Sequence, residues 1–167
     1  MSTPPIFVDS IDDNIYEFGD SIDSAALGKS LDNLSTISYR YVDFENTDYH
    51  FRQACFDNED IIWYFDFMSM LSDNPFNDLM NDKDPSWHLN PNNYDKDKRF
   101  QELVDKALNV TSKLPIEKQP SFYHFALYTK ANANRKTGVK SPRIYFFIGA
   151  NAVIYPLFYD PYHEINP

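Results

Sequence analysis

The residues best suited to do chemistry lie near the C-terminal end, in the run Asp160-Pro161-Tyr162-His163. This run follows an apolar stretch that predicts a β-strand, so a rigid sheet would hold these side chains at a solvent-accessible edge. An imidazole titrates near neutral pH and a carboxylate can fix its tautomer, so His163 oriented by Asp160 is a candidate general acid or base. The alternative is structural: Asp160 and Pro161 form a turn, and His163 bonds to backbone.

Two arginines in predicted strands, Arg40 and Arg143, are candidate anchors for a phosphate or a carboxylate, because a guanidinium binds oxyanions in a bidentate way. Arg143 completes the candidate catalytic set, while Arg40 joins Tyr41 and His88 as candidate ligand-binding residues. The alternative for each arginine is an ion pair with an acidic side chain, or stacking on a tyrosine. A basic segment between residues 130 and 141 supplies the remaining ligand-binding candidates, which are Lys130, Arg135, Lys136 and Lys140.

Other residue types that often carry chemistry have a structural interpretation. His88 and His124 show no spacing of a recognised metal cluster, so we predict no metal site and no cofactor. Cys55 lies beside acidic residues, which raise a thiol pKa and disfavour the nucleophilic thiolate. The four glycines form no phosphate-binding loop, which excludes a P-loop nucleotide hydrolase.

Charge is distributed unevenly along the 167 residues, whose net charge is −10. Residues 1–60 hold 13 acidic and 3 basic side chains, whereas residues 101–167 hold 5 acidic and 8 basic ones. An acidic protein is a poor non-specific binder of duplex DNA, because such binding depends on Lys and Arg. A single cysteine, no leader-like pattern and no apolar run near 20 residues predict a cytoplasmic protein without a membrane span.

The middle of the chain predicts helices. Asp57 or Asn58 begins one that extends to about Ser72 and is apolar nearly all round, which indicates burial on more than one side. A short helix follows Asn74-Pro75 and ends near Leu79. A polar, proline-containing loop is expected over 81–97. Residues 98–112 have the spacing of an amphipathic helix.

Strands flank these helices. The predicted strands cover residues 36–43, 122–129, 143–148 and 152–159, with a possible short one at 6–8. The predicted fold class is α+β, with an antiparallel sheet of three to five strands that ends in a C-terminal hairpin and packs on two or three helices. Residues 1–36 form an acidic N-terminal extension, and 37–167 form one domain. In the hairpin, Arg143 lies across from Asp160. If strand 36–43 joins the same sheet, Arg40 or Tyr41 approaches that pair.

The C-terminal residues from Ile144 to Ile165 resemble the ends of many small uncharacterised bacterial proteins, which close on a hairpin followed by Asp-Pro-x-His. A weaker likeness at 38–43 and 88–91 extends the resemblance over about residues 37–167. This chain has Pro156-Leu-Phe-Tyr where that group has a tryptophan-rich last strand. The resemblance implies an accessory protein of a mobile element, of the phage or toxin-like kind.

Two functions from different classes follow. The first is a toxin-like or defence-associated protein of a mobile element that acts on RNA, or on another phosphate-bearing target, through its C-terminal sheet. The second is a non-catalytic acidic protein-interaction module, such as an inhibitor or nucleic-acid mimic, whose first 60 residues engage a basic protein surface. The sequence leaves open whether the chain is an enzyme, and its oligomeric state.

Overall fold

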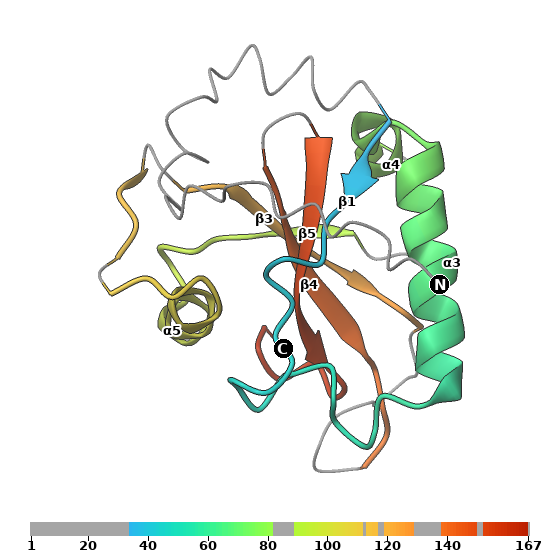
Figure 1. Ribbon diagram of the computed structural model, residues 1–167, viewed down its shortest axis with the longest axis horizontal. Helices are drawn as coiled ribbons and strands as arrows, with labels where there is room; N and C mark the ends of the chain where they lie inside the picture. Colours follow the sequence, from blue (N-terminus) through green and yellow to red (C-terminus); the bar gives the residue numbers. More distant parts are fainter. Residues whose placement is uncertain are drawn as a thin grey trace, which may run out of the picture.

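A five-stranded sheet in the order β1-β5-β4-β3-β2 forms the centre of the protein in the computed structural model (Figure 1). The structure describes residues 34–81, 89–111, 113–116, 119–128, 138–149 and 152–166. The strands are β1 (Thr36–Ile37), β2 (Asn90–Asn92), β3 (Ser121–Ala126), β4 (Arg143–Ile148) and β5 (Val153–Asp160). All neighbours pair antiparallel except β1 and β5, which are parallel. The predicted α+β class, with a C-terminal hairpin, is confirmed.

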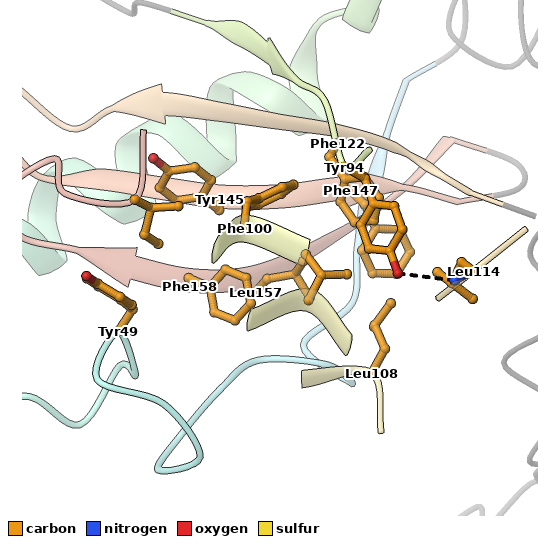
Figure 2. Close-up of a cluster of buried hydrophobic side chains, with 12 residues drawn as sticks. Tyr49, Tyr94, Phe100, Leu108, Leu114, Phe122, Tyr145, Phe147, Leu157 and Phe158 are labelled. Carbon is orange, nitrogen blue, oxygen red and sulfur yellow. Dashed lines mark hydrogen bonds between the residues drawn. The ribbon is translucent and has the colours of Figure 1, made fainter. Parts of the chain in front are cut away.

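Helices cover both faces of this sheet. The helices α3 (Asn58–Asp73) and α4 (Phe76–Asn81) pack on one face, and α5 (Lys98–Ala107) packs on the other. Every residue of β4 is therefore buried, and successive side chains alternate between the two cores, as Phe146 and Phe147 do. Figure 2 shows the core on the α5 side, where Phe100 lies beside Tyr145.

Local sequence signals set the starts of α3 and α5. The Asp57 side chain accepts hydrogen bonds from the backbone N–H groups of Glu59 and Asp60, and the Asp60 side chain accepts one from Asp57 N–H, which completes a capping box. At the other helix, the Asp97 carboxylate accepts from the Phe100 N–H at 2.9 Å. Both starts agree with the sequence prediction.

The strand expected over 36–43 contains only the two residues of β1. Ser38 N–H still donates to the Ile154 carbonyl at 2.9 Å. The next bond of a parallel ladder needs the N–H of residue 156, which is proline and has none. The chain turns away after Ser38 and rejoins β5 where Asp43 N–H donates to the Leu157 carbonyl. Thr36, predicted to lie in the N-terminal extension, is the first residue of β1.

The segment 81–97, expected to be a loop, contributes the edge strand β2. Its three residues, Asn90, Pro91 and Asn92, pair antiparallel with β3. Proline is compatible with an edge strand because one side of such a strand makes no ladder bonds. The prediction missed this strand because the segment has neither apolar alternation nor β-branched residues.

Several sequence predictions fall outside the described residues: the possible strand at 6–8, and the candidate residues His88, Lys130, Arg135 and Lys136. Within the described residues, none of the helices combines the length and apolar character that crossing a membrane requires.

Candidate functional site

The hairpin brings the predicted pair Arg143 and Asp160 together, as direct cross-strand partners of β4 and β5. Both are buried, Asp160 completely. The guanidinium Nη1 of Arg143 donates to Ser141 O and Oγ at 3.0 Å and to Pro142 O at 3.2 Å. Burial lowers the pKa of Arg143. The predicted register is confirmed. Nη1 is occupied by neighbouring backbone and hydroxyl oxygens, whereas Nε is buried and makes no hydrogen bond within the described residues.

The Asp160 carboxylate shapes the turn that follows β5. It accepts hydrogen bonds from the backbone N–H groups of Tyr162, Glu164 and Ile165 at 3.2, 2.6 and 2.8 Å. Burial raises the pKa of Asp160, and the three N–H donors oppose this shift. The geometry is that of a turn-forming aspartate, which was the structural alternative for this residue.

His163 meets another histidine in this turn. It has a φ of 54°, in the left-handed region that residues other than glycine rarely adopt. Its ring centroid lies 5.9 Å from that of His124 in β3. The Nδ1 of His124 is 2.9 Å from Oδ1 of Asn92, and the His124 ring is 5.2 Å from that of Tyr145. Polar side chains from four parts of the chain therefore form one cluster: His163 of the C-terminal turn, Asn92 of β2, His124 of β3 and Tyr145 of β4. His124 is almost fully buried in this cluster.

Arg40 and Tyr41 lie elsewhere. The Tyr41 ring packs against Tyr155 and Phe147, with centroids 5.3 and 5.7 Å apart, and the Arg40 guanidinium lies 5.3 Å from the Tyr41 ring centre. Because Phe147 is four residues along β4 from Arg143, the two candidate groups are separated by roughly 13 Å of strand. The hypothesis that they converge at one end of the sheet is wrong.

Lys140, a candidate phosphate-binding residue, holds the N-terminal end of α3. Its ammonium donates to Asp60 at 2.6 Å, to Asp57 at 2.9 Å and to the Cys55 carbonyl at 2.7 Å. Burial lowers its pKa, but the hydrogen bonds to Asp60 and Asp57 outweigh that effect and raise it. Lys140 is therefore a protonated lysine whose three donors all have partners within the protein.

Two tyrosine hydroxyls complete the group around Asp60, which is fully buried. Tyr128 donates to Oδ1 at 2.8 Å and Tyr159 donates to Oδ2. Burial, followed by the bond to the carboxylate, raises the pKa of both phenols. Burial also raises the pKa of the nearby Cys55 thiol. These groups are therefore protonated near neutral pH, which suits a structural anchor better than a nucleophile or base.

The side of α3 that points away from the sheet has an unexpected apolar character. Ile61, Ile62, Trp63 and Phe65 are exposed to 37, 61, 41 and 58%. The buried side consists of Asp60, Tyr64, Phe67, Met68 and Leu71. The expectation that this helix is buried on more than one side is wrong. We call Ile61, Ile62, Trp63 and Phe65 the α3 outer face.

Acidic residues lie among the apolar side chains of the α3 outer face. Glu59, Asp66 and Asp73 are exposed on the same helix, and residues 58–73 contain neither Lys nor Arg. With Ile62 and Ser69 they follow a spacing of three and four residues, which places them along one stripe of the helix. This side of α3 thus combines large apolar side chains with acidic ones and contains no basic residue.

This surface is not predicted from the sequence, because a helix that is apolar nearly all round is expected to be buried. The available signal was the run of acidic positions interleaved with the apolar ones, which a fully buried helix does not tolerate. Among the described residues, no three His, Cys, Asp or Glu side chains are grouped so as to hold a metal ion. Comparison with known proteins gave no match: no family model fits the chain, and neither a curated protein nor a solved structure is significantly similar to it.

Proposed function

We propose that this chain is a protein-binding module whose docking surface is the α3 outer face. The observation that carries the proposal is the exposure of four apolar side chains within residues 61–65 of one helix, of which Ile62 and Phe65 are more than half exposed. Exposed large apolar side chains that are grouped in this way mark interaction sites in many proteins. Trp63 adds the residue type that most often dominates the binding energy of an interface.

The acidic residues of this stripe indicate the chemistry of the partner. Glu59, Asp66 and Asp73 would face like charges in a symmetric contact between two copies of α3, which disfavours self-association through this surface. A partner with an apolar patch bordered by Lys or Arg is complementary in both respects. The net charge of −10 adds long-range attraction to such a basic surface and speeds association at low salt.

The toxin-like action on RNA stays a prediction from the sequence. Of its candidate groups, Arg143 and Lys140 donate to oxygens of the protein itself, and Asp160 forms a turn. Lys130, Arg135, Lys136 and His88 lie outside the described residues. The protein-binding proposal has support from the described surface and is therefore placed first.

The test compares the wild-type chain with the double variant Ile62→Ser/Phe65→Ser and with Lys106→Ser on α5 as the matched surface control. Proteins captured from host lysate are identified, purified and titrated against all three chains by calorimetry. We expect a basic partner whose affinity falls roughly tenfold or more with the double variant and also falls with salt, and is unchanged with Lys106→Ser. A captured protein counts only after this direct titration.

Other occupants of the surface give distinct results. If no purified binder distinguishes the double variant, the proposal is wrong. If the wild-type chain sediments as a dimer and the double variant as a monomer, the occupant is a second copy. Coverage by the chain's own first 33 residues is tested with Ile62→Cys in a Cys55→Ser background. The rate at which a thiol reagent labels position 62 in a monomer is compared with the rate for Lys106→Cys. Labelling at position 62 that is roughly tenfold slower would show that the surface is already covered.

A further inference from the structure

A cavity of about 530 Å³ lies where the end of β2, the N-terminal end of α5 and the C-terminal residues meet. Its lining includes Asn92, Lys96, Asp97, Lys98, Arg99 and Asn166. Because α5 packs on the opposite face of the sheet from α3, this cavity is separate from the α3 outer face.

The lining is positively charged although the chain is strongly acidic. It contains three cations, Lys96, Lys98 and Arg99, and one carboxylate, Asp97, which accepts from the Phe100 N–H as the cap of its own helix. Among the described residues, Lys96 makes no ion pair, and the ammonium of Lys98 lies 3.6 Å from Glu102 in an exposed pair. Cations in an acidic protein normally have acidic neighbours, so their grouping around a cavity indicates an anionic ligand.

One of the three cations is fixed in position. The Arg99 guanidinium donates to the Glu164 carbonyl at 3.2 Å and to the Tyr49 hydroxyl, and it lies 5.3 Å from the Tyr49 ring centre. These contacts connect α5 to the C-terminal turn and hold a permanent positive charge at the cavity wall. A ligand therefore meets a charge whose side chain is already ordered, which reduces the entropy lost on binding.

Asn92 supplies a hydrogen-bond donor that lacks a partner. Its Oδ1 lies 2.9 Å from His124 Nδ1 and accepts from Asn166 Nδ2 at 3.3 Å. An amide oxygen only accepts, so His124 is the tautomer that carries its proton on Nδ1. The Nδ2 of Asn92 is buried and makes no hydrogen bond in the described part of the chain. A buried donor without an acceptor is costly, and this one belongs to a residue that lines the cavity.

We propose that this cavity binds the phosphate group of a small phosphate monoester. A phosphate dianion matches the charge of Lys96 and Lys98 beside the fixed Arg99, and its oxygens are strong hydrogen-bond acceptors for ammonium and guanidinium groups. The cavity has the volume of sites that hold organic molecules, so it has room for a group attached to the phosphate. This inference does not depend on the protein-binding proposal.

The test uses adenosine 5′-monophosphate as the probe, with inorganic phosphate and adenosine in parallel, at constant ionic strength. Titration of the ¹⁵N-labelled full chain follows the side-chain amide signals of Asn92 and Asn166. We expect saturable shifts with the monophosphate and with inorganic phosphate, and none with adenosine. Lys98→Ala should weaken binding roughly tenfold, whereas Lys106→Ala, at the other end of α5, should leave it within about twofold.

Asn92→Asp is the decisive variant, because it keeps the size of the side chain and an acceptor for His124 and Asn166 but replaces the free donor by a negative charge. It should abolish phosphate binding while the far-ultraviolet circular dichroism is unchanged. Equal binding of adenosine and its monophosphate, or equal losses with Lys98→Ala and Lys106→Ala, would overturn the proposal. Single-stranded RNA that binds far more tightly than the monophosphate would show instead that the surface recognises a polyanion.

Discussion

The helices α3 and α5 pack on opposite faces of one sheet and both begin with an aspartate cap, yet their outward sides differ. The outward side of α5 is charged, and its buried residues, Phe100 and Val104, lie on a single stripe. In α3 the buried stripe is equally complete, but the opposite side exposes Ile62 and Phe65 as well. Every apolar residue of α5 packs in the core beside the sheet, whereas only some of the apolar residues of α3 do.

This difference shows what an apolar pattern leaves undetermined. A helix that is apolar on one stripe can only place that stripe against a core. A helix that is apolar nearly all round is compatible with burial on two sides or with a docking surface, and only the tertiary arrangement distinguishes the two. Because the described elements leave the α3 outer face exposed, its apolar residues are not explained by the stability of the fold.

The largest expected effect separates the two sides of α3. The Phe67 ring is fully buried and stacks on Phe125 with centroids 3.4 Å apart. Phe67→Ala should reduce the free energy of unfolding by about 3–5 kcal/mol, because it leaves a cavity between helix and sheet. Ile62→Ala on the outer face should change it by less than about 0.5 kcal/mol. Urea denaturation measures both, and similar losses for the two variants would contradict an uncovered outer face.

The starts of the two helices provide the second comparison. Asp60 holds α3 through Lys140, Tyr128 and Tyr159, whereas the described contacts of Asp97 at α5 are those of a helix cap. Asp60→Ala should cost about 3 kcal/mol, since it leaves a partly buried ammonium without its nearest counter-charge. Asp97→Ala should cost about 1 kcal/mol, the typical value for a lost cap. Thermal or urea unfolding of the two variants measures this difference, and equal costs would show that the Asp60 network adds nothing to the cap.

Much of the fold follows from local sequence. The caps at Asp57 and Asp97 and the hairpin of β4 and β5 depend on residues close together in the chain. The short β1 does not, because its end is imposed by Pro156 in a strand more than 100 residues away. The edge strand β2 has no apolar signal because it consists of Asn90, Pro91 and Asn92, and Asn92 makes polar contacts with His124 and Asn166.

The candidate site was predictable only where strand geometry decides it. The pairing of Arg143 with Asp160 across the two strands follows from the number of residues on each side of the hairpin loop. The contact of His163 with His124 depends on a turn with a left-handed φ at His163, which no local pattern indicated. The hydrogen bond from Lys140 to Asp60 depends on how α3 packs on the sheet. It therefore could not be predicted from the sequence near either residue.

The smallest expected effect concerns the exposed member of the same network. The hydrogen bond from Lys140 holds the pKa of Asp57 below its ordinary value of 3.8, with further bonds from the Asp60 and Glu59 N–H groups. A carboxylate whose pKa is lower in the folded state stabilises the protein above its unfolded pKa. That contribution is lost as the pH falls through the folded value. The relevant window therefore lies below about pH 4.

Asp57→Asn isolates this charge, because asparagine is an equally good helix cap. The variant should be slightly less stable than wild type at pH 7, and the difference should shrink as the pH is lowered through the window below about pH 4. Urea midpoints at pH 7 and near pH 3 measure this difference, with Asp66→Asn, at an exposed position of the same helix, as control. A difference that stays constant with pH would mean that the Asp57 charge does not stabilise the start of α3, and that Asp60 alone distinguishes it from the start of α5.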